Sequence, residues 1–232
     1  PTDGTIKLEG QDIQSFKGQG LKDYRTMVQA VFQDPWSSLS PRMKVKDIVS
    51  EALVVNRDVT NKERDDRIAE VMSQVGLQKT QAELYPHEFS GGQRQRIGIA
   101  RALAVNPSFI VCDEPVSALD VSIQAQVINL LEELQEKFNL TYLFIAHDLG
   151  VVKYISDRII VMYFGKIVEI ASSQEIYENP RHPYTEALLA AISKYKAGSK
   201  RDILLKGGIP DPSNPPKGCI LEPRCAYAKD IC

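Results

Sequence analysis

The sequence predicts an α/β fold built around a parallel sheet, and two observations carry this prediction. Short apolar segments with strand character alternate with amphipathic segments of helical period along the chain. A run of hydroxyl and glycine residues opens one predicted helix, and a pair of carboxylates closes one predicted strand. Strands and helices that take turns in this way form parallel sheets with helices between the strands.

The composition limits the class of protein. The chain has 232 residues and a net charge of −2, and 43% of its residues are hydrophobic. It therefore lacks the basic excess of proteins that mainly bind nucleic acid. The apolar run Ile159–Phe164 is far shorter than the roughly 20 residues that span a bilayer. We expect a soluble protein of the reducing cytosol, without a cleavable signal sequence and with at most a peripheral role at a membrane.

The first part of the chain changes from strand to helical patterns. Residues 2–9 predict a turn and a short strand, and Gly10–Asp12 predicts the next turn. Met27–Phe32 is an apolar strand, and Ser37–Pro41 is expected to be loop because a proline precedes it. From Lys46 to Gly76 the apolar residues recur at helical spacing, which predicts a small helical subdomain.

The second part alternates regularly. A helix that begins at Ser90 ends before Pro107, and a strand up to Cys112 follows it. The later patterns predict a helix over 121–138, a strand over 141–146, a helix over 149–156, strands over 158–163 and 166–170, and short helices around Glu175 and Glu186.

The helix start at Ser90, Gly91, Gly92 and Gln93 suits phosphate binding. Free backbone N–H groups and the positive end of the helix dipole meet there, and the glycines leave room for a ligand. A plain helix cap with a flexible entry is the alternative. The two interpretations are compatible, because capping exposes the same donors.

Two adjacent carboxylates follow the strand Phe109–Cys112. Asp113 suits Mg²⁺ binding, directly or through water, and Glu114 suits polarising an attacking water. The alternative for Glu114 is a solvated acid at a strand end.

Five segments in order resemble the ATPase subunit of an ABC transporter. Gln33 resembles the Q-loop, Ser90–Gln93 the signature motif, Phe109–Glu114 the Walker B motif, Ser117–Asp120 the D-loop and His147 the switch histidine. The resemblance covers nearly the whole chain. It implies a P-loop NTPase-like ABC ATPase core with a helical subdomain and a C-terminal cysteine-bearing extension, and it implies ATP and Mg²⁺ as ligands.

The resemblance also implies roles for single residues. Gln33 would bind Mg²⁺ through its amide oxygen, and His147 would contact the γ-phosphate of ATP. Ser90 and its neighbours would close over ATP held by a second subunit, and Asp120 would lie at that dimer interface. A turn glutamine and a core histidine are the alternatives for Gln33 and His147.

On this basis four parts are expected. They are a partial ATPase core with the Q-loop (1–45), a helical subdomain ending in the signature helix (46–100), an ATPase core with the remaining motifs (101–172) and a C-terminal extension (173–232). The signature begins with Phe89 where the family more often has leucine, which should matter little because the phosphate contacts follow it.

The family's P-loop, Gly-x-x-x-x-Gly-Lys-Ser/Thr, occurs nowhere in these 232 residues. We expect the sequence to be a fragment of a longer chain that carries this motif, and we do not expect these residues alone to hydrolyse ATP. A catalytically inert chain is an alternative, which the intact Asp113, Glu114 and His147 oppose. A nucleic-acid-associated ABC ATPase is a further one, but no basic patch or duplicated cassette supports it.

The run His182–Leu189 and the tail behind it are similar to the oligopeptide and dipeptide importer subgroup. This implies uptake of peptides or similar solutes at the cytoplasmic face of the cell membrane. The implied partners are a second ATPase subunit, identical or different, two membrane permease subunits and, indirectly, an extracytoplasmic solute-binding protein. The segment Trp36–Pro41 would dock a permease helix, with Trp36 as core filler the alternative.

The four cysteines form two groups, one cysteine within a predicted strand and three near the end of the sequence. Cys112 lies in an apolar strand and is expected to be a small buried hydrophobe. Cys219, Cys225 and Cys232 lie in a proline-rich tail that offers no core to bury them, so thiolate ligation of a metal is the sharper hypothesis. The resemblance implies a [4Fe–4S] cluster with a fourth ligand beyond Cys232. Zinc and inert thiols remain as alternatives.

Overall fold

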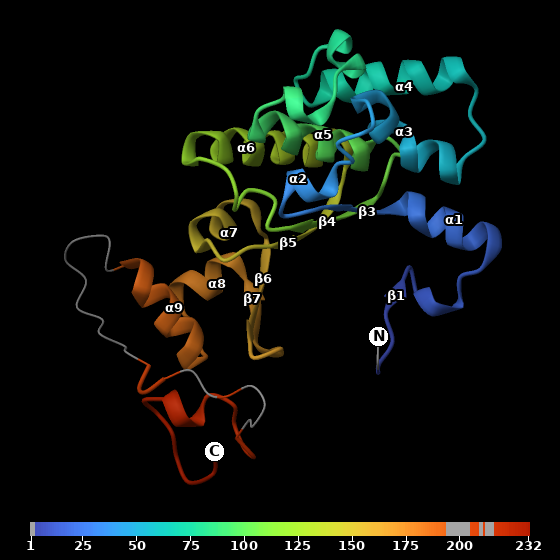
Figure 1. Cartoon of the computed structure of the whole chain (residues 1–232). Coiled ribbons are helices and arrows are strands. Elements are labelled where there is room, and N and C mark those ends of the chain that lie inside the picture. The colour runs from blue at the N-terminus through green and yellow to red at the C-terminus, as the bar shows by residue number, and fades with distance from the viewer. Residues whose placement is uncertain (1–2, 194–204, 209–210, 212–215) are drawn as a thin grey trace. The chain divides into compact units, whose positions relative to one another are not determined.

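The computed structural model describes residues 3–193, 205–208, 211 and 216–232 (Figure 1). The chain divides into two compact units, Pro1–Ala146 and His147–Cys232. The first unit contains a parallel sheet and a layer of helices. The second contains an antiparallel hairpin, three short helices and the described part of the tail.

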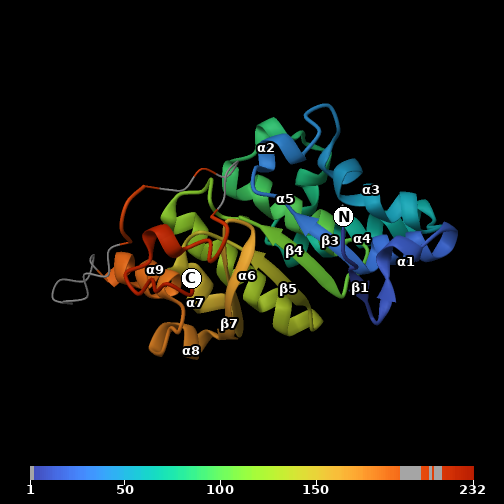
Figure 2. The same ribbon diagram turned by 90° about the horizontal axis from the view of Figure 1, so that it is seen from below.

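The sheet of the first unit has three parallel strands in the order β3 (Val28–Val31), β4 (Phe109–Asp113) and β5 (Thr141–Ile145). In Figure 2 the three strands lie side by side. Parallel strands end at one edge of a sheet, so the residues after Val31, Asp113 and Ile145 follow strand ends at the same edge.

The two faces of this sheet differ in burial. Val31, Ile110 and Cys112 point to a buried face, where the Tyr142 hydroxyl donates to the Leu131 carbonyl of the helix α6 (Val121–Phe138). Burial raises the pKa of the Cys112 thiol to about 12, so this cysteine packs as a small hydrophobe, as the sequence predicts. On the other face Leu143 and Ile145 are 44% and 45% exposed.

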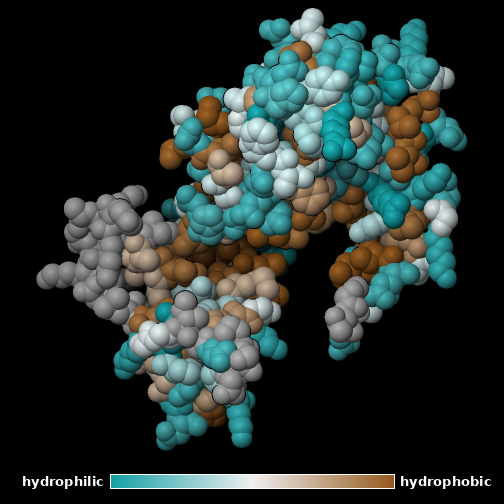
Figure 3. All heavy atoms as spheres, in the orientation of Figure 1, coloured by the Kyte–Doolittle hydropathy of each residue, from teal (hydrophilic) through white to brown (hydrophobic). Residues whose placement is uncertain are grey.

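The helical layer consists of α3 (Val45–Asn56), α4 (Asn61–Gln74) and α5 (Gly91–Leu103). Their apolar faces meet in a core whose members include Val45, Ile48, Val71, Met72 and Ile97, all at most 2% exposed. The outward surface over α4 is mainly hydrophilic (Figure 3), whereas α3 exposes Val54 and Val55 near its C-terminal end. The apolar residues that predicted these helices recur about every 3.6 residues because each helix buries one face.

Three elements near the N-terminus correct the sequence predictions. Gln11–Asp12, expected as a turn, forms β2, which pairs with β1 (Lys7–Leu8). Helix α1 (Gly18–Met27) was not predicted, because Gly18 and Gly20 in its first turn are poor helix formers. The helix α2 (Pro35–Ser38) replaces part of the expected loop, because Asp34 Oδ1 accepts from Trp36 N (2.8 Å) and Pro35 suits a first helical turn.

The second unit contains α7 (Leu149–Ile155), β6 (Arg158–Tyr163), β7 (Lys166–Ser172), α8 (Ser173–Glu178) and α9 (Pro183–Ser193). Both strands were predicted from the sequence, and the structure pairs β6 and β7 as antiparallel neighbours. The two residues between them, Phe164 and Gly165, have φ of +50° and +73°, which suits a tight hairpin turn. A connection of two residues is too short to join parallel strands.

The tail contacts this unit through side chains. The Arg224 guanidinium donates to the Tyr163 hydroxyl (3.3 Å), and the Tyr227 hydroxyl donates to the Glu186 carboxylate (3.3 Å). Leu221 is 1% exposed, so the tail also buries an apolar side chain. Across the described part of the chain, no helix has both the length and the apolar character needed to cross a membrane.

Glu83 joins the start of α3 to the short turn of helix Lys79–Glu83. Its carboxylate accepts from Lys44 Nζ (2.8 Å) and Lys46 Nζ (2.6 Å), and these hydrogen bonds lower its pKa from 4.5 to about 2. A lowered pKa stabilises the fold above pH 4.5, and this contribution is lost as the pH falls towards 2. The carboxylate is 56% exposed, so water and salt weaken the effect.

We predict that Glu83→Gln makes the protein less sensitive to acid. Between pH 5 and pH 3 the parent should lose more stability in urea unfolding than the variant does, because only the parent has this carboxylate to protonate. The difference should be small and should shrink in 1 M salt. Equal losses in both proteins at low salt would contradict the role of Glu83.

Candidate functional site

Two of the predicted site residues meet after the ends of β3 and β4. Gln33 Nε2 donates to Glu114 Oε2 (2.9 Å), although the two residues are 81 positions apart in sequence. Asp113 ends β4 and is exposed. The Gln33 amide and the Glu114 carboxylate therefore meet at this edge of the sheet, and Asp113 precedes Glu114 directly in the sequence. Carboxylate and amide oxygens are the kind of ligand that Mg²⁺ prefers.

The backbone of Glu114 is held in an unusual conformation. Its φ is +43°, a region that side chains other than glycine rarely adopt. Its N–H donates to the Ile145 carbonyl (2.9 Å), and its carbonyl accepts from Ser117 N (3.2 Å) and Ser117 Oγ (3.1 Å). These bonds fix the turn that follows β4. A strained residue that is held from both sides is typical of a functional site.

The predicted phosphate-binding run begins α5. Ser90 is the N-cap: its Oγ accepts from Gln93 N (3.4 Å), and Gln93 Oε1 accepts from Ser90 N (3.0 Å). In addition to its predicted role in phosphate binding, Gln93 is therefore the reciprocal partner of Ser90 in a capping box. Helix α5 has 13 residues, so its N-terminus carries a dipole that favours anions.

Gly92 packs against the first turn of α6. A Cβ at this position would lie 2.5 Å from Ile123 Cγ2, closer than side chains approach one another. Gly91 is less constrained, since its Cβ would lie 3.6 Å from Leu119. Gly92 therefore allows the start of α5 to approach the turn that carries Asp120.

Asp120 is the N-cap residue of α6, and its side chain makes no capping bond. Gln124 fixes the turn before it, because Nε2 donates to the carbonyls of Val116 (3.0 Å) and Leu119 (3.0 Å). Gln124 was not predicted as a site residue from the sequence. A glutamine four residues after the D-loop aspartate was the available signal, since it can reach back one helical turn.

His147 is the first residue of the second unit and is exposed. The next residue, Asp148, caps α7, with Oδ1 accepting from Gly150 N (2.7 Å) and Val151 N (3.3 Å). The core-histidine alternative is therefore wrong. The core-filler alternative for Trp36 is also wrong, because this ring is 59% exposed.

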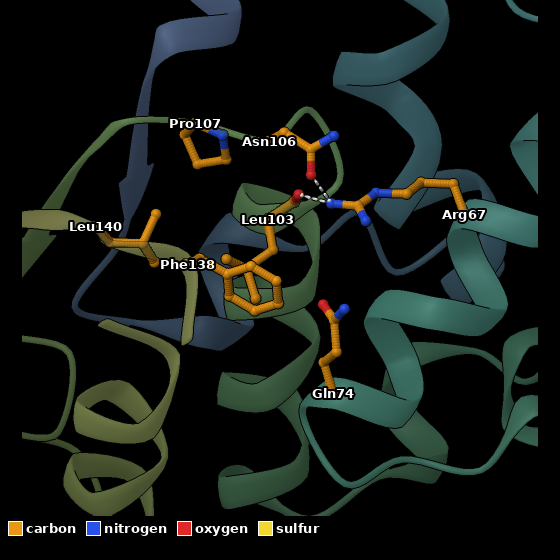
Figure 4. Close-up of a pocket in the computed structure, with 7 residues that line it drawn as sticks. All are labelled: Arg67, Gln74, Leu103, Asn106, Pro107, Phe138 and Leu140. Atoms are coloured by element: carbon orange, nitrogen blue, oxygen red, sulfur yellow. Dashed lines mark hydrogen bonds between the residues drawn. The ribbon is translucent and has the colours of Figure 1, made fainter. Parts of the chain in front are cut away.

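A cavity of about 180 Å³ lies elsewhere in the first unit (Figure 4). Arg67 crosses one side of it and donates to the carbonyls of Ala104 (3.0 Å) and Leu103 (2.6 Å), the last turn of α5. The remaining lining residues are Gln74, Asn106, Pro107, Phe138 and Leu140. None of the predicted site residues contributes to this cavity.

The tail cysteines do not gather as a metal centre in the described structure. Within residues 3–193, 205–208, 211 and 216–232, no three acidic, histidine or cysteine side chains form a group that could hold a metal ion. Cys219 N donates to the Cys232 carbonyl (2.7 Å), whereas Cys225 Sγ accepts from Tyr227 N (3.4 Å). In the described residues the three thiols therefore do not meet at one point.

Comparison with known sequences identifies the family. Residues 1–117 match the family described as ABC transporter, and residues 168–232 match the oligopeptide/dipeptide transporter, C-terminal region. The whole chain is 55% identical to the oligopeptide transport ATP-binding protein AppF of Bacillus subtilis and covers 72% of that protein. The chain belongs to the ABC transporter ATPases. It is also 60% identical, over 82% of its length, to the dipeptide transport ATP-binding protein DppF of Lactococcus lactis, of which it covers 62%.

Solved structures support the same fold. The ATP-binding cassette MJ0796, in a dimeric post-hydrolysis state bound to ADP and Pi, superimposes with a TM-score of 0.65 at 29% identity and covers 75% of each chain. The protein cbiO1 of Clostridium perfringens superimposes with a TM-score of 0.68 at 25% identity, over 84% of this chain and 77% of the other. The protein is thus an ATP-binding subunit with the P-loop NTPase fold, and its family couples ATP hydrolysis to transport.

We predict that Gly92→Ala destabilises this ABC ATPase by about 1–3 kcal/mol, because the new methyl group overpacks against Ile123. Thermal or urea unfolding measures the change. Adding Ile123→Ala should restore most of the loss. Gly98→Ala on the same helix is the matched control: its Cβ meets nothing within 4 Å, so we expect a gain of about 0.5–1 kcal/mol. Equal effects of the two alanines would contradict the close contact.

Proposed function

We propose that this subunit hydrolyses ATP to drive import of oligopeptides or dipeptides. Two findings support the substrate class: the match of residues 168–232 to the C-terminal region of peptide transporters, and the peptide-import names of the relatives. The observation that carries the catalytic part is the hydrogen bond between Gln33 and Glu114.

Glu114 is proposed as the general base. A water that attacks the γ-phosphate in line would donate a hydrogen bond to this carboxylate, which orients the water and accepts its proton. The Gln33 amide nitrogen and the fixed backbone of Glu114 hold the side chain beside the end of β4. Glu114 then needs little reorganisation when the water arrives, and this preorganisation lowers the barrier.

Gln33 and Asp113 are proposed to hold Mg²⁺, Gln33 through its amide oxygen and Asp113 directly or through water. Oxygen ligands at this position fit the ion. When bound, Mg²⁺ neutralises the charge that develops on the phosphate oxygens. The 232 residues contain no Gly-x-x-x-x-Gly-Lys-Ser/Thr run, so activity has to be measured on the full-length protein.

Ser90, Gly91, Gly92 and Gln93 are proposed to bind the phosphates of ATP held by a second subunit. The N-terminus of α5 offers backbone N–H groups and the Ser90 hydroxyl, and its dipole favours the anion. The dimeric state of the solved MJ0796 structure, with ADP and Pi bound, supports a two-subunit site. Bound ATP would stabilise the closed dimer, and hydrolysis would remove that link.

His147 is proposed to donate a hydrogen bond to the γ-phosphate, and Asp120 to lie at the interface between the two ATPase subunits. An exposed imidazole two residues after the end of β5 suits the first role. An exposed carboxylate beside the packed Gly92–Ile123 contact suits the second. Asp120 would then act only when two subunits meet.

The proposed assembly places the protein at the cytoplasmic face of the cell membrane. A second ATPase subunit, identical or different, and two permease subunits would complete the transporter, with an extracytoplasmic solute-binding protein delivering the peptide. The exposed ring of Trp36, in the short helix after Gln33, supports docking of a permease helix at α2.

For the tail we propose a [4Fe–4S] cluster in the full-length protein, with Cys219, Cys225 and Cys232 as three of its ligands. The exposure of Cys219 and Cys232, and the backbone bond that joins them, support two neighbouring ligands. Cys225 would have to move towards them. No catalytic role follows from the cluster, because the proposed ATP ligands lie elsewhere in the sequence.

We predict that Glu114→Gln in the full-length transporter slows ATP hydrolysis by about 10²- to 10⁴-fold. The amide keeps the shape and the contact with Gln33 but lacks the basic carboxylate. Mg-ATP binding should remain, and ATP-dependent dimers should accumulate in sedimentation experiments. Glu136→Gln, an exposed acid on α6, is the control and should keep the parental rate. A parental rate in Glu114→Gln would exclude this residue as the base.

We predict that full-length protein purified without oxygen contains iron and acid-labile sulfide in near-equal amounts. Cys225→Ser should remove both without weakening Mg-ATP binding, whereas Cys112→Ala should retain both because Cys112 is buried in β4. Stoichiometric zinc would reassign the tail as a structural zinc site. Protein with neither metal would refute ligation by these thiols.

A further inference from the structure

The helix α9 begins with a histidine cap. His182 directly precedes the helix, and its ring atom Nδ1 accepts from Tyr184 N (3.2 Å), while its carbonyl accepts from Glu186 N (3.1 Å). Pro183 occupies the first helical position, where no N–H is needed. The usual cap residues are serine, threonine, aspartate and asparagine, which do not titrate near neutral pH. A histidine cap therefore depends on the protonation state of its ring.

This cap requires a neutral ring. Nδ1 can accept a hydrogen bond only while the proton of the neutral imidazole is on Nε2. A second proton would put an N–H group of His182 against the N–H of Tyr184, and it would add a positive charge at the positive end of the helix dipole. Burial lowers the pKa of His182 below 6.5, and the Glu169 carboxylate opposes this effect only in part. The folded protein therefore favours the ring form that caps α9.

Glu169 of β7 fixes the chain in front of the cap. Its Oε1 accepts from Arg181 N (2.9 Å), and its Oε2 accepts from His182 N (3.1 Å). Burial raises the pKa of Glu169, but the hydrogen bonds that it accepts outweigh burial and lower the pKa below 4.5. Glu169 therefore remains charged between about pH 5 and pH 7, the range in which a histidine titrates. A change of the cap in this range belongs to His182.

Charged groups on the neighbouring elements are engaged elsewhere. Arg181, beside the cap, lies with Nη2 4.0 Å from Glu175 Oε2 of α8, and both side chains are exposed. Glu186, in the first turn of α9, accepts a hydrogen bond from the tail. The carboxylate that acts on the pKa of the His182 ring is therefore that of Glu169.

Helix α9 supports the tail through two residues of its first turn. Tyr184 packs against the ring of Tyr163, with the ring centres 4.6 Å apart, and the Tyr163 hydroxyl accepts from Arg224 (3.3 Å). Glu186 accepts from the hydroxyl of Tyr227 (3.3 Å). Both contacts depend on the helical position of residues that follow the cap closely. Loosening the first turn of α9 therefore weakens the attachment of the tail.

We propose that His182 is a pH-sensitive latch of the C-terminal tail: its neutral ring caps α9 and holds the tail in place, and protonation of the ring removes the cap and releases the tail. The proton comes from solvent and binds at Nδ1. Because the pKa of His182 in the fold lies below 6.5, the stabilising effect of the cap is fully present above pH 6.5 and is lost as the pH falls through the folded pKa. None of the proposed ATP-binding residues belongs to the latch.

The test uses the full-length protein and measures hydrogen exchange of backbone amides in α9 and in residues 219–227 at pH 7.5 and pH 5.5. Exchange rates are converted to protection factors, which removes the intrinsic effect of pH on exchange. In the parent, the protection of both regions should fall about fivefold at the lower pH, the typical effect of losing a cap. His182→Asn supplies a cap that does not titrate, so its protection should change less than about twofold. His182→Ala should have low protection at both pH values.

His87→Asn is the matched control. His87 is an exposed histidine of the first unit, and its ring stacks on that of Tyr85, with the ring centres 5.7 Å apart. This variant should keep the parental response to pH. An NMR titration of the His182 ring in the parent provides a second readout that needs no variant to fold, and it should give a pKa below 6.5.

Three results would overturn the proposal. The first is a parental response to pH in His182→Asn. The second is a rise in the protection of α9 at pH 5.5, or a pKa of His182 above 6.5, because either would mean that the attraction of Glu169 for a charged ring outweighs the lost cap. The third is a loss of protection confined to α9, with residues 219–227 unchanged, because the tail would then not depend on the cap.

Discussion

The position of α5 depends on arginine side chains that donate to backbone carbonyls. Arg94, Arg96 and Arg101 project from the helix to carbonyls of neighbouring segments, while Arg57 and Arg67 reach the carbonyls at its C-terminal end from α3 and α4. A guanidinium carries five donors in a rigid plane, so one side chain can satisfy several carbonyls at once. Cations at a C-terminal helix end are also favoured by the dipole.

This arrangement explains how an arginine-rich helix can be buried in the first unit. Helix α5 contains no acidic residue, so ion pairs within the helix cannot neutralise its arginines. The carbonyls of Leu103 and Ala104, at the C-terminal end of α5, accept from Arg67, and Figure 4 shows the bond to Leu103. Each hydrogen bond between a guanidinium and a carbonyl therefore offsets the desolvation penalty of both groups. The N-terminal turn of α5, with Ser90, is held in place as a result.

The sequence predicted those elements whose own residues determine them. The helix Val121–Phe138 has its predicted bounds, because Asp120 and the left-handed Asn139 end it locally. The antiparallel hairpin of β6 and β7 could have been predicted from Phe164-Gly165, a two-residue connection with turn composition. The short helix α2 was missed because its four residues carry no periodic pattern, and its stability comes from Asp34 and from contacts with α5.

The contacts between distant segments could not have been predicted from one sequence. Motif order placed Gln33 and Glu114 in the same site, but only the parallel pairing of β3 with β4 brings their side chains to 2.9 Å. The requirement for glycine at position 92 likewise depends on Ile123, which the chain reaches 31 residues later. Arg94 and Arg101 look like ordinary charged positions of an amphipathic helix until α2 is seen beside them. Local spacing therefore indicates which groups can perform chemistry, whereas the packing of one helix decides where these groups meet.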